Sequence, residues 1–516
     1  MPWKRDRHEL FGGGIYRLVS PDNPEFPANA CWDLTNMVYD RANEDPEKMR
    51  GYVRLGSTDM GGVVTGLFDF DEGAALVATA QDGKVYEYKG SDFAVPSSGT
   101  NTGFTQITGK RWSGNMFYGG VTGKNLLILT SDDDDDVPQR YDTTNGTVAL
   151  GGSPPDKGKF PVPFGGRMWM AAGETLHYSA ADNAEDWTTL GGSFHVDRGS
   201  GEITGLYVFM GNLLIFKRRK ILRLLPGGSL ASTAIRELSS RIGTPSHFSI
   251  QEVGGASRNS TLFFMSDTGI QELMPTASVG GFMIHNVADD IKPILDRRSR
   301  TNLAQAWATF NEDRGEYYLQ YCINDNTPDE GVIGNVALGR KTRWTINDMA
   351  NKTAGAIYRS SGQELQVIAD TSGRVYQMHS GDSRAGAGYR GVFTSASFSQ
   401  GDRFRMKKYG RVAIDFSTDG SYGIDMRMLL GRSALPLPRG NIDQPSGFGA
   451  TDGWGTGIWG QAVWGGSITA GQWIRPQKVV RGSFMKIAAE TTGANQWFKV
   501  NGLGIEYDYR RATLRA

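Results

Sequence analysis

Five consecutive aspartates form the densest group of potential metal ligands in the sequence, within the stretch SDDDDDVP. If Asp132 is the first position of a calcium-binding loop, Asp134 and Asp136 occupy its third and fifth positions, as such a loop requires. The sixth position is then Val137 instead of glycine, and the twelfth is Thr143 instead of glutamate. The run therefore favours a solvated acidic turn, with a weak cation site as the alternative. No other cofactor is expected.

Charge at two places could also act on phosphate. In the acidic run, Asp133 and Asp135 would repel phosphate if they faced a channel that passes nucleic acid. Positive charge is concentrated in four consecutive cations, Lys217, Arg218, Arg219 and Lys220. They could face phosphate or an acidic partner, but a charged hairpin that protects a sheet edge explains them equally well. Over the whole chain 55 Lys and Arg balance 55 Asp and Glu, which argues against a broadly basic nucleic-acid-binding protein.

Catalytic motifs are missing from the sequence. The six histidines form no HExxH motif and no i, i+4 pair, and no GxSxG nucleophile elbow occurs. Two GxGxxG matches, GAGYRG and GTGIWG, neither follow a strand nor open a helix, so a dinucleotide site is rejected. Asp69 and Asp71 are the one carboxylate pair near the start of an expected repeat, where a glycosidase would need its acids. We expect no enzyme, and keep a glycosidase as an alternative.

Three tryptophans, Trp454, Trp459 and Trp464, are spaced five residues apart, and each is followed by glycine. This spacing puts the rings on different faces of a helix and on alternate faces of a strand, so a folded loop is indicated. We expect this loop, within residues 432–472, to be anchored between domains or between subunits. The alternative is an aromatic platform for sugars, as in a lectin-like carbohydrate-binding protein.

The elements that must position these groups are short strands. The 69 glycines and 20 prolines punctuate apolar runs, and hairpins with an Asp and Gly turn recur, as in LVATAQDGKVYEYKG, LFFMSDTGIQELM and LQVIADTSGRVYQMHSG. Strands begin near Leu67, Phe117, Phe164, Leu206, Gln251, Gln305 and Ala356. Such spacing predicts an all-β chain with a β-propeller of about six to eight blades, seven preferred, over residues 61–384. Residues 1–60 are expected to close or brace it, and a pair of unrelated β-sandwiches is the alternative.

Two further elements complete the expected architecture. Ile291, Ile294 and Leu295 stand at helical spacing, which predicts an amphipathic helix over residues 286–307. It would bridge two blades, or alternatively present these side chains to a neighbouring subunit. After residue 385 longer runs alternate with period two, which predicts a C-terminal antiparallel β-sandwich over residues 385–516.

The two cysteines, Cys31 and Cys322, stand far apart in apolar surroundings and are expected to be buried, reduced thiols. No run approaches 18 apolar residues, and the charged N-terminal stretch lacks the apolar core of a signal peptide. We therefore expect synthesis in the cytoplasm and no membrane-spanning segment.

Several longer stretches share their pattern with a known family. They are LHYSAADNAEDWTTL, ITGLYVFMGNLLIFKRRKILRL and RIGTPSHFSIQEVGG, together with the early LTNMVYDRANEDPEKMRGYVRLGS, the ADDIKPIL segment and the WGTGIWGQAVWGG loop. In these stretches the sequence resembles the propeller-containing tail nozzle or tail tubular proteins of short-tailed bacteriophages, and the resemblance extends over most of the chain. The shared patterns are loose, with no invariant signature.

The resemblance implies a virion structural protein located in the phage tail. It implies a ring, of six copies, that extends the portal and adaptor axis and passes genomic DNA without sequence-specific binding. The implied partners are other copies of the chain, the head-to-tail adaptor proteins, and tail fibres or a tail needle. The resemblance brings no catalytic motif with it, and a non-specific DNA contact agrees with the balanced charge.

Overall fold

The computed structural model describes residues 4–8, 11–40, 44–97, 110–118, 125–132, 136–225, 234–255, 258–276, 281–337, 341–360, 362–401, 404–419, 422–430, 433–436, 440–441, 468–474 and 480–509. Within them the regular structure is almost wholly β-strand, and the one α-helix, α1 (Lys292–Leu295), has four residues. The mainly-β fold that the glycine-punctuated apolar runs predict is confirmed.

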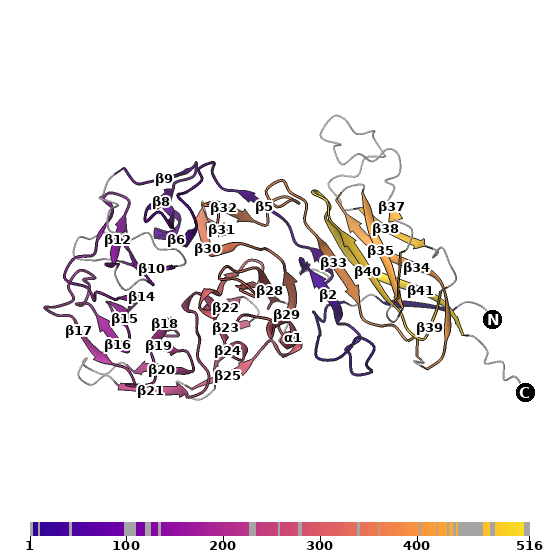
Figure 1. Cartoon of the computed structure of the whole chain (residues 1–516), viewed down its shortest axis with the longest axis horizontal. Coiled ribbons are helices and arrows are strands. Elements are labelled where there is room, and N and C mark those ends of the chain that lie inside the picture. The colour runs from indigo at the N-terminus through magenta and orange to yellow at the C-terminus, as the bar shows by residue number, and fades with distance from the viewer. Residues whose placement is uncertain are drawn as a thin grey trace, which may run out of the picture.

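Seven four-stranded antiparallel units follow one another along the described chain (Figure 1). The first unit comprises β6 (Val64–Phe70), β7 (Ala75–Ala80), β8 (Val85–Tyr88) and β9 (Phe93–Ala94). The second comprises β10 (Trp112–Phe117), β11 (Leu126–Ser131), β12 (Gln139–Asp142) and β13 (Gly146–Ala149). The third comprises β14 (Lys159–Phe164), β15 (Arg167–Ala172), β16 (Thr175–Tyr178) and β17 (Gly192–His195). The fourth comprises β18 (Ile203–Phe209), β19 (Asn212–Lys217), β20 (Lys220–Leu225) and β21 (Ala234–Ser239).

Three more units follow, and the last of them takes its fourth strand from the early part of the chain. The fifth comprises β22 (Gln251–Gly255), β23 (Arg258–Ser266), β24 (Gly269–Pro275) and β25 (Phe282–Asn286). The sixth comprises β26 (Trp307–Asn311), β27 (Glu316–Tyr321), β28 (Glu330–Asn335) and β29 (Arg343–Asn347). The seventh comprises β30 (Lys352–Ser360), β31 (Gln363–Asp370), β32 (Val375–Met378) and, as its fourth strand, β5 (Tyr52–Arg54).

The hairpins inside these units follow from local turn chemistry. Gly83 and Gly373, in the turns after β7 and β31, have φ of 76° and 78°, a left-handed conformation that glycine adopts without steric cost. The three hairpins expected from Asp and Gly turns are formed as β7–β8, β23–β24 and β31–β32. All six residues of β7, β11 and β27 are buried, as expected for strands covered on both faces by neighbouring sheets.

The first strands of the units contact one another in turn. Strand β10 contacts both β6 and β14, β14 contacts β18, and β26 contacts both β22 and β30. The 3-10 turn η3 (His247–Ser249) contacts β18, β23 and β26 and so connects the fourth unit with the fifth and sixth. Strand β30 contacts β6, which brings the seventh unit against the first. In Figure 1 the units lie around a common centre with these first strands nearest to it.

The remaining strands form two further layers. The sheet of the sixth unit continues through β2 (Cys31–Thr35), β33 (Gly391–Ser395), β40 (Lys486–Thr491), β35 (Gly423–Leu430) and β36 (Ser433–Pro436), with β37 (Gly440–Asn441) also on β35. The facing sheet comprises β3 (Met37–Tyr39), β4 (Pro46–Lys48), β41 (Phe498–Tyr509), β34 (Lys407–Thr418) and β38 (Ile468–Ile474), with β1 (Lys4–His8) on β41 and β39 (Val480–Gly482) on β34. Strands β1 to β4 thus belong to these layers, while β5 belongs to the seventh unit.

The two layers share one core with the units beside them. Ile414 from β34 and Leu503 from β41 are buried in the same cluster as Met428 from β35, so the two sheets pack face to face. The cluster also contains Phe263 from the fifth unit and Leu319 from the sixth. The hydrophobic core therefore runs without a break from the four-stranded units into the paired sheets.

The prediction of a long amphipathic helix over residues 286–307 is wrong. The segment contains η4 (Asp289–Ile291), the single turn α1 and η5 (Leu303–Gln305), and it enters β26 at Trp307. The backbone N–H of Ser299 donates to the carbonyl of Cys322, which draws the chain out of a helical path. One turn is enough to bury Ile291, Ile294 and Leu295, so the apolar spacing is satisfied without a longer helix.

Candidate functional sites

The basic run lies in the hairpin between β19 and β20, where Lys217 and Lys220 are paired across the two strands. The Lys217 side chain is buried, and its Nζ donates to the carbonyls of Val196 (2.8 Å) and Asp197 (3.0 Å) and to Oγ of Ser200 (2.7 Å). The Nζ of Lys220 lies 2.6 Å from a carboxylate oxygen of Asp197. These two lysines therefore tie the fourth unit to the segment that precedes it.

The two arginines at the tip of this hairpin are paired as well. Arg218 contacts both carboxylate oxygens of Asp267 through Nε (3.2 Å) and Nη2 (3.0 Å), and Arg219 Nε lies 3.4 Å from Oδ2 of the same residue. Lys220 has a second acidic neighbour in Glu237, at 3.3 Å. All four cations therefore have partners within the chain, and a contact with phosphate would compete with these interactions.

The acidic run is described only at its two ends, since Asp133, Asp134 and Asp135 lie outside the described residues. Burial raises the pKa of Asp132, while Lys159 and Arg111 oppose the shift. Asp136 is 5 % exposed, so the expectation of a solvated turn is wrong for this residue. The described residues contain no group of three His, Cys, Asp or Glu side chains that could hold a metal ion.

The carboxylate pair considered for a glycosidase lies at the end of β6 and in the following turn η1 (Asp71–Gly73). Burial raises the pKa of Asp69 to about 6. A carboxylate oxygen of Asp71 accepts a hydrogen bond from Asn125 at 2.6 Å. Neither aspartate is among the described residues that line the cavity at the centre of the units.

The residues considered for subunit contacts fall into two groups. Ile291, Ile294 and Leu295 are 1 %, 5 % and 1 % exposed and belong to the core, so they present no surface to a neighbour. The tryptophans at 454, 459 and 464 lie outside the described residues. Their predicted roles, as loop anchors or as a sugar platform, stay predictions.

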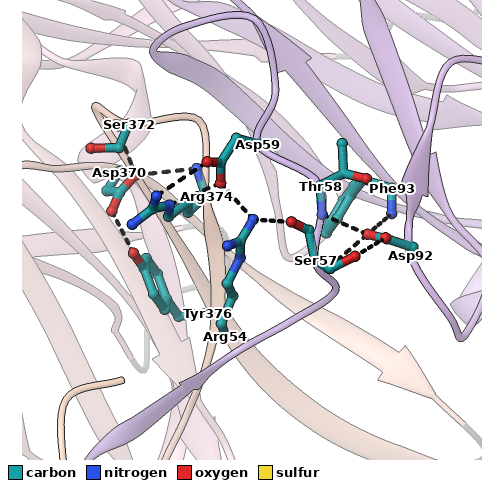
Figure 2. A network of polar contacts seen from close by, with 10 residues as sticks. All are labelled: Arg54, Ser57, Thr58, Asp59, Asp92, Phe93, Asp370, Ser372, Arg374 and Tyr376. Carbon is teal, nitrogen blue, oxygen red and sulfur yellow. Dashed lines mark hydrogen bonds and ion pairs between the residues drawn. The ribbon is translucent and has the colours of Figure 1, made fainter. Parts of the chain in front are cut away.

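A polar network joins β5 to the first and seventh units (Figure 2). The guanidinium of Arg374 binds both carboxylate oxygens of Asp59, through Nε (2.9 Å) and Nη2 (3.1 Å), and Arg54 Nη2 donates to the same carboxylate at 2.5 Å. Tyr376 donates its hydroxyl hydrogen to Asp370 at 2.7 Å. Because Asp59 is half exposed, its ion pairs contribute modestly to stability and chiefly fix the position of the segment after β5.

The other half of the network is centred on Asp92, just before β9. Its carboxylate accepts hydrogen bonds from the backbone N–H groups of Ser57 (2.9 Å), Thr58 (3.0 Å) and Phe93 (2.8 Å), and also from the hydroxyl of Ser57. The Ser57 hydroxyl and these N–H groups lower the pKa of Asp92. Figure 2 shows the chain around Ser57 lying between Asp92 and the Arg374 cluster, so the network holds the first and seventh units to one segment.

A cavity of about 520 Å³ lies at the centre of the seven units. Each first strand contributes to its wall, and so does η3. Much of the wall is apolar, and the polar side chains on it include Arg111, Asn115, His247 and Gln251. Small-molecule sites are usually concave, with a few polar groups that converge on the ligand, and this wall places such groups among apolar side chains.

Sequence reasoning missed Arg111, and found no motif that includes His247. In the sequence Arg111 follows Lys110 and looks like half of a surface basic pair. Arg111 is 6 % exposed and directly precedes Trp112, the first residue of β10, which is 4 % exposed. The signal that could have identified Arg111 is its position just before the first strand of a repeat, since these first strands surround the central cavity.

The cysteines behave as the sequence predicts. Cys31 and Cys322 are buried and free, and burial raises the pKa of both thiols, that of Cys322 to about 12. None of the helices in the described ranges is long and apolar enough to cross a membrane.

No protein-family model matches this chain, and no curated protein sequence matches it either.

Proposed function

We propose that the seven four-stranded units close into a seven-bladed β-propeller. Three observations support closure: β30 of the seventh unit contacts β6 of the first, all seven first strands line one cavity, and the strand β5 completes the seventh unit from the early part of the chain. A fourth strand supplied from before the first unit joins the two ends of the array, so that hydrogen bonds within a sheet hold the ring shut. The polar network around Asp59 and Asp92 reinforces the same junction.

On this fold we propose a structural role, as a subunit of the nozzle ring of a short phage tail. The observation that carries the proposal is the ten-stranded sheet that runs from the sixth unit into the paired sheets, joined where Thr35 of β2 pairs with Ile346 of β29. Within the described residues this sheet and the shared core join the two regions directly. A ring that retains and releases a genome requires subunits that do not bend at a linker, because each interface is repeated until the ring closes.

The distribution of charge is consistent with passage of DNA without tight binding. The most basic stretch, residues 217–220, is paired within the chain, and the whole sequence carries no net charge. Loss of these ion pairs would offset the gain from counterion release on a phosphate backbone. The ring is proposed to contain six copies, to contact adaptor proteins on one side and fibres or a needle on the other, and to act in the virion.

Assembly tests the proposal directly. The full chain, alone and mixed with purified adaptor rings, is expected to form closed rings in negative-stain electron microscopy. If the loop around Trp459 contributes to the contact, Trp459→Ala reduces ring formation, whereas Tyr118→Ala, which removes a half-exposed ring on the second unit, leaves it unchanged. A chain that stays monomeric at high concentration and never associates with portal and adaptor complexes would exclude the nozzle role.

A further inference from the structure

The cavity at the centre of the units is lined by a guanidinium group, that of Arg111, which forms no ion pair within the described residues. Arg111 is 6 % exposed, and its Nη1 donates to the carbonyls of Gln305 (3.1 Å) and Ala306 (3.4 Å). The ring of Phe248 lies 3.9 Å from the centre of the guanidinium. No carboxylate of the described chain lies within ion-pair distance of Arg111. The charge of Asp132 acts from farther away and partly opposes the lowering of the Arg111 pKa by burial.

The donor of Arg111 left for a ligand is Nη2. A guanidinium has five N–H groups, of which Nη1 carries two. Within the described residues neither Nε nor Nη2 donates a hydrogen bond, but Nε is fully buried, so a ligand in the cavity does not reach it. A carboxylate or phosphate oxygen can therefore accept a charge-assisted hydrogen bond from Nη2.

The charge state of the site favours an anion. Burial lowers the pKa of Arg111 to about 10, so the side chain remains protonated at neutral pH. Burial, and secondarily the charge of Arg111, lower the pKa of His247 to about 4, so this ring is neutral at the same pH. A buried cation without a partner is costly, and the cost is removed when an anion binds.

His247 adds a second polar group to the same wall. Its Nδ1 is buried without a hydrogen-bond partner, and its ring lies 4.7 Å from that of Phe160. A ligand in the cavity does not reach this buried nitrogen, so His247 contributes its ring to the wall and no hydrogen bond. Arg111 directly precedes β10, and its guanidinium lies over the ring of Phe248, the residue after His247.

We propose that the central cavity binds a small organic oxyanion, whose carboxylate or phosphate group accepts a hydrogen bond from Nη2 of Arg111. The rest of the ligand lies against the apolar wall formed by residues such as Trp112, Val162 and Trp307. A volume of about 520 Å³ is within the range of small-molecule sites and accommodates an aromatic acid. The inference goes beyond the proposed tail function, which requires no ligand.

The experiment uses the full chain with three probes: 4-fluorobenzoate, phenyl phosphate and the neutral 4-fluorobenzamide. Binding of the two fluorinated probes is followed by ¹⁹F NMR line broadening, and all three are compared by the shift in unfolding temperature. The wild type is expected to bind the benzoate and not the benzamide. Displacement of the benzoate by phenyl phosphate shows that the site accepts a phosphate as well as a carboxylate, and failure to displace it restricts the site to carboxylates.

Three variants and one control locate the site. Arg111→Met is expected to weaken benzoate binding at least tenfold. Arg111→Lys keeps the charge but not the position of the Nη2 donor, and is expected to weaken binding by less than Arg111→Met does. Arg218→Met removes an arginine that is paired with Asp267 outside the cavity and is expected to leave binding unchanged. Asn115→Phe fills the cavity from the same strand as Trp112 and is expected to abolish binding even if the Arg111 variants fail to fold. Equal binding of benzoate and benzamide, no binding of either anion, or wild-type binding by a folded Arg111→Met or Asn115→Phe protein would overturn the proposal.

Discussion

Substitution of Gly73 tests whether the first and seventh units meet as proposed. Gly73 ends the turn between β6 and β7 with φ of 99°, and a Cβ added there would lie 1.4 Å from the carbonyl oxygen of Arg359 in β30. Favourable separations between non-bonded heavy atoms are about 3.5 Å, so the turn and β30 would have to move apart by roughly 2 Å. Because Arg359 belongs to the seventh unit, the strain falls on the junction that closes the proposed ring.

The expected size of the effect has two parts. A left-handed backbone costs an alanine about 1–2 kcal/mol relative to glycine. Displacement of two packed backbone segments adds about 1–3 kcal/mol, by analogy with overpacked cores. Gly90→Ala is a matched control, because Gly90 has φ of 91° and nothing within 4 Å of an added Cβ. It carries the first cost alone, so we expect Gly73→Ala to lose about 1–3 kcal/mol more than Gly90→Ala.

Urea unfolding followed by tryptophan fluorescence measures the difference, with limited proteolysis to show which region opens first. Gly73→Ala is expected to unfold at a lower urea concentration than Gly90→Ala and to be cut first near the first or seventh unit. Equal midpoints for the two variants would refute the contact between Gly73 and Arg359, and with it the closure of the propeller at this junction.

Buried groups elsewhere give three further expected outcomes. Lys217→Met should lower the free energy of unfolding in urea by about 2–4 kcal/mol, because it leaves two carbonyls and a hydroxyl without their donor. Arg219→Met removes an exposed side chain and should lower it by under about 0.5 kcal/mol. Equal losses would contradict the burial of the Lys217 side chain. Burial raises the pKa of Glu47 to about 7, so between about pH 4.5 and 7 the folded state binds more protons than the unfolded state and stability falls as pH rises. Glu47→Gln should therefore gain stability relative to the wild type across that window and hold the gain above it, and a pH-independent difference in unfolding temperature would exclude this. Cys31 and Cys322 should not react with a disulfide reagent in the native protein and should both react in urea, so rapid labelling of the native chain would show that the thiols are accessible.

The strands and their turns could be predicted because their signals are local. Residues expected to begin strands, among them Leu67, Leu206 and Gln251, lie in β6, β18 and β22, the first strands of their units. The apolar pattern that marks a strand is contained in a few consecutive residues, and the conformation of a glycine in a turn depends on its immediate neighbours. Short-range information of this kind is fully present in one sequence.

The prediction of a long helix over residues 286–307 failed because local spacing does not fix the length of a helix. Three apolar residues at helical spacing are compatible with one turn as well as with six, and nothing in their spacing fixes the length. A helical turn fixes several backbone angles for few hydrogen bonds, so the packing of Ile294 and Leu295 decides how far it extends. Once these side chains are buried, the chain gains more from the contact of Ser299 with Cys322 than from another turn.

The charged residues could not be predicted because their partners are distant in sequence. Arg218 and Arg219 meet Asp267, which lies 49 and 48 residues further on in another unit. A run of cations therefore looks alike whether it faces solvent, phosphate or its own fold. Arg111 shows the opposite case: in the sequence it looks like part of a surface basic pair, but in the structure it is buried at the wall of the central cavity.

Closure of the ring and occupation of its centre are coupled by geometry. The cavity wall is made of strands from every unit, so a ligand that contacts several of them binds the closed arrangement and not the open one. An anion on Arg111 would thus stabilise the junction between β6 and β30 although it touches neither Gly73 nor Arg359. The unpaired guanidinium acts in the opposite direction when the cavity holds only water, because the closed ring must then bury a charge that the open array exposes. In the proposed propeller, the hydrogen bonds around Asp59 and Asp92 fix the segment between the first and seventh units, and Arg111 is a buried charge in the wall at the centre, where a bound anion would add to the stability of the closed ring.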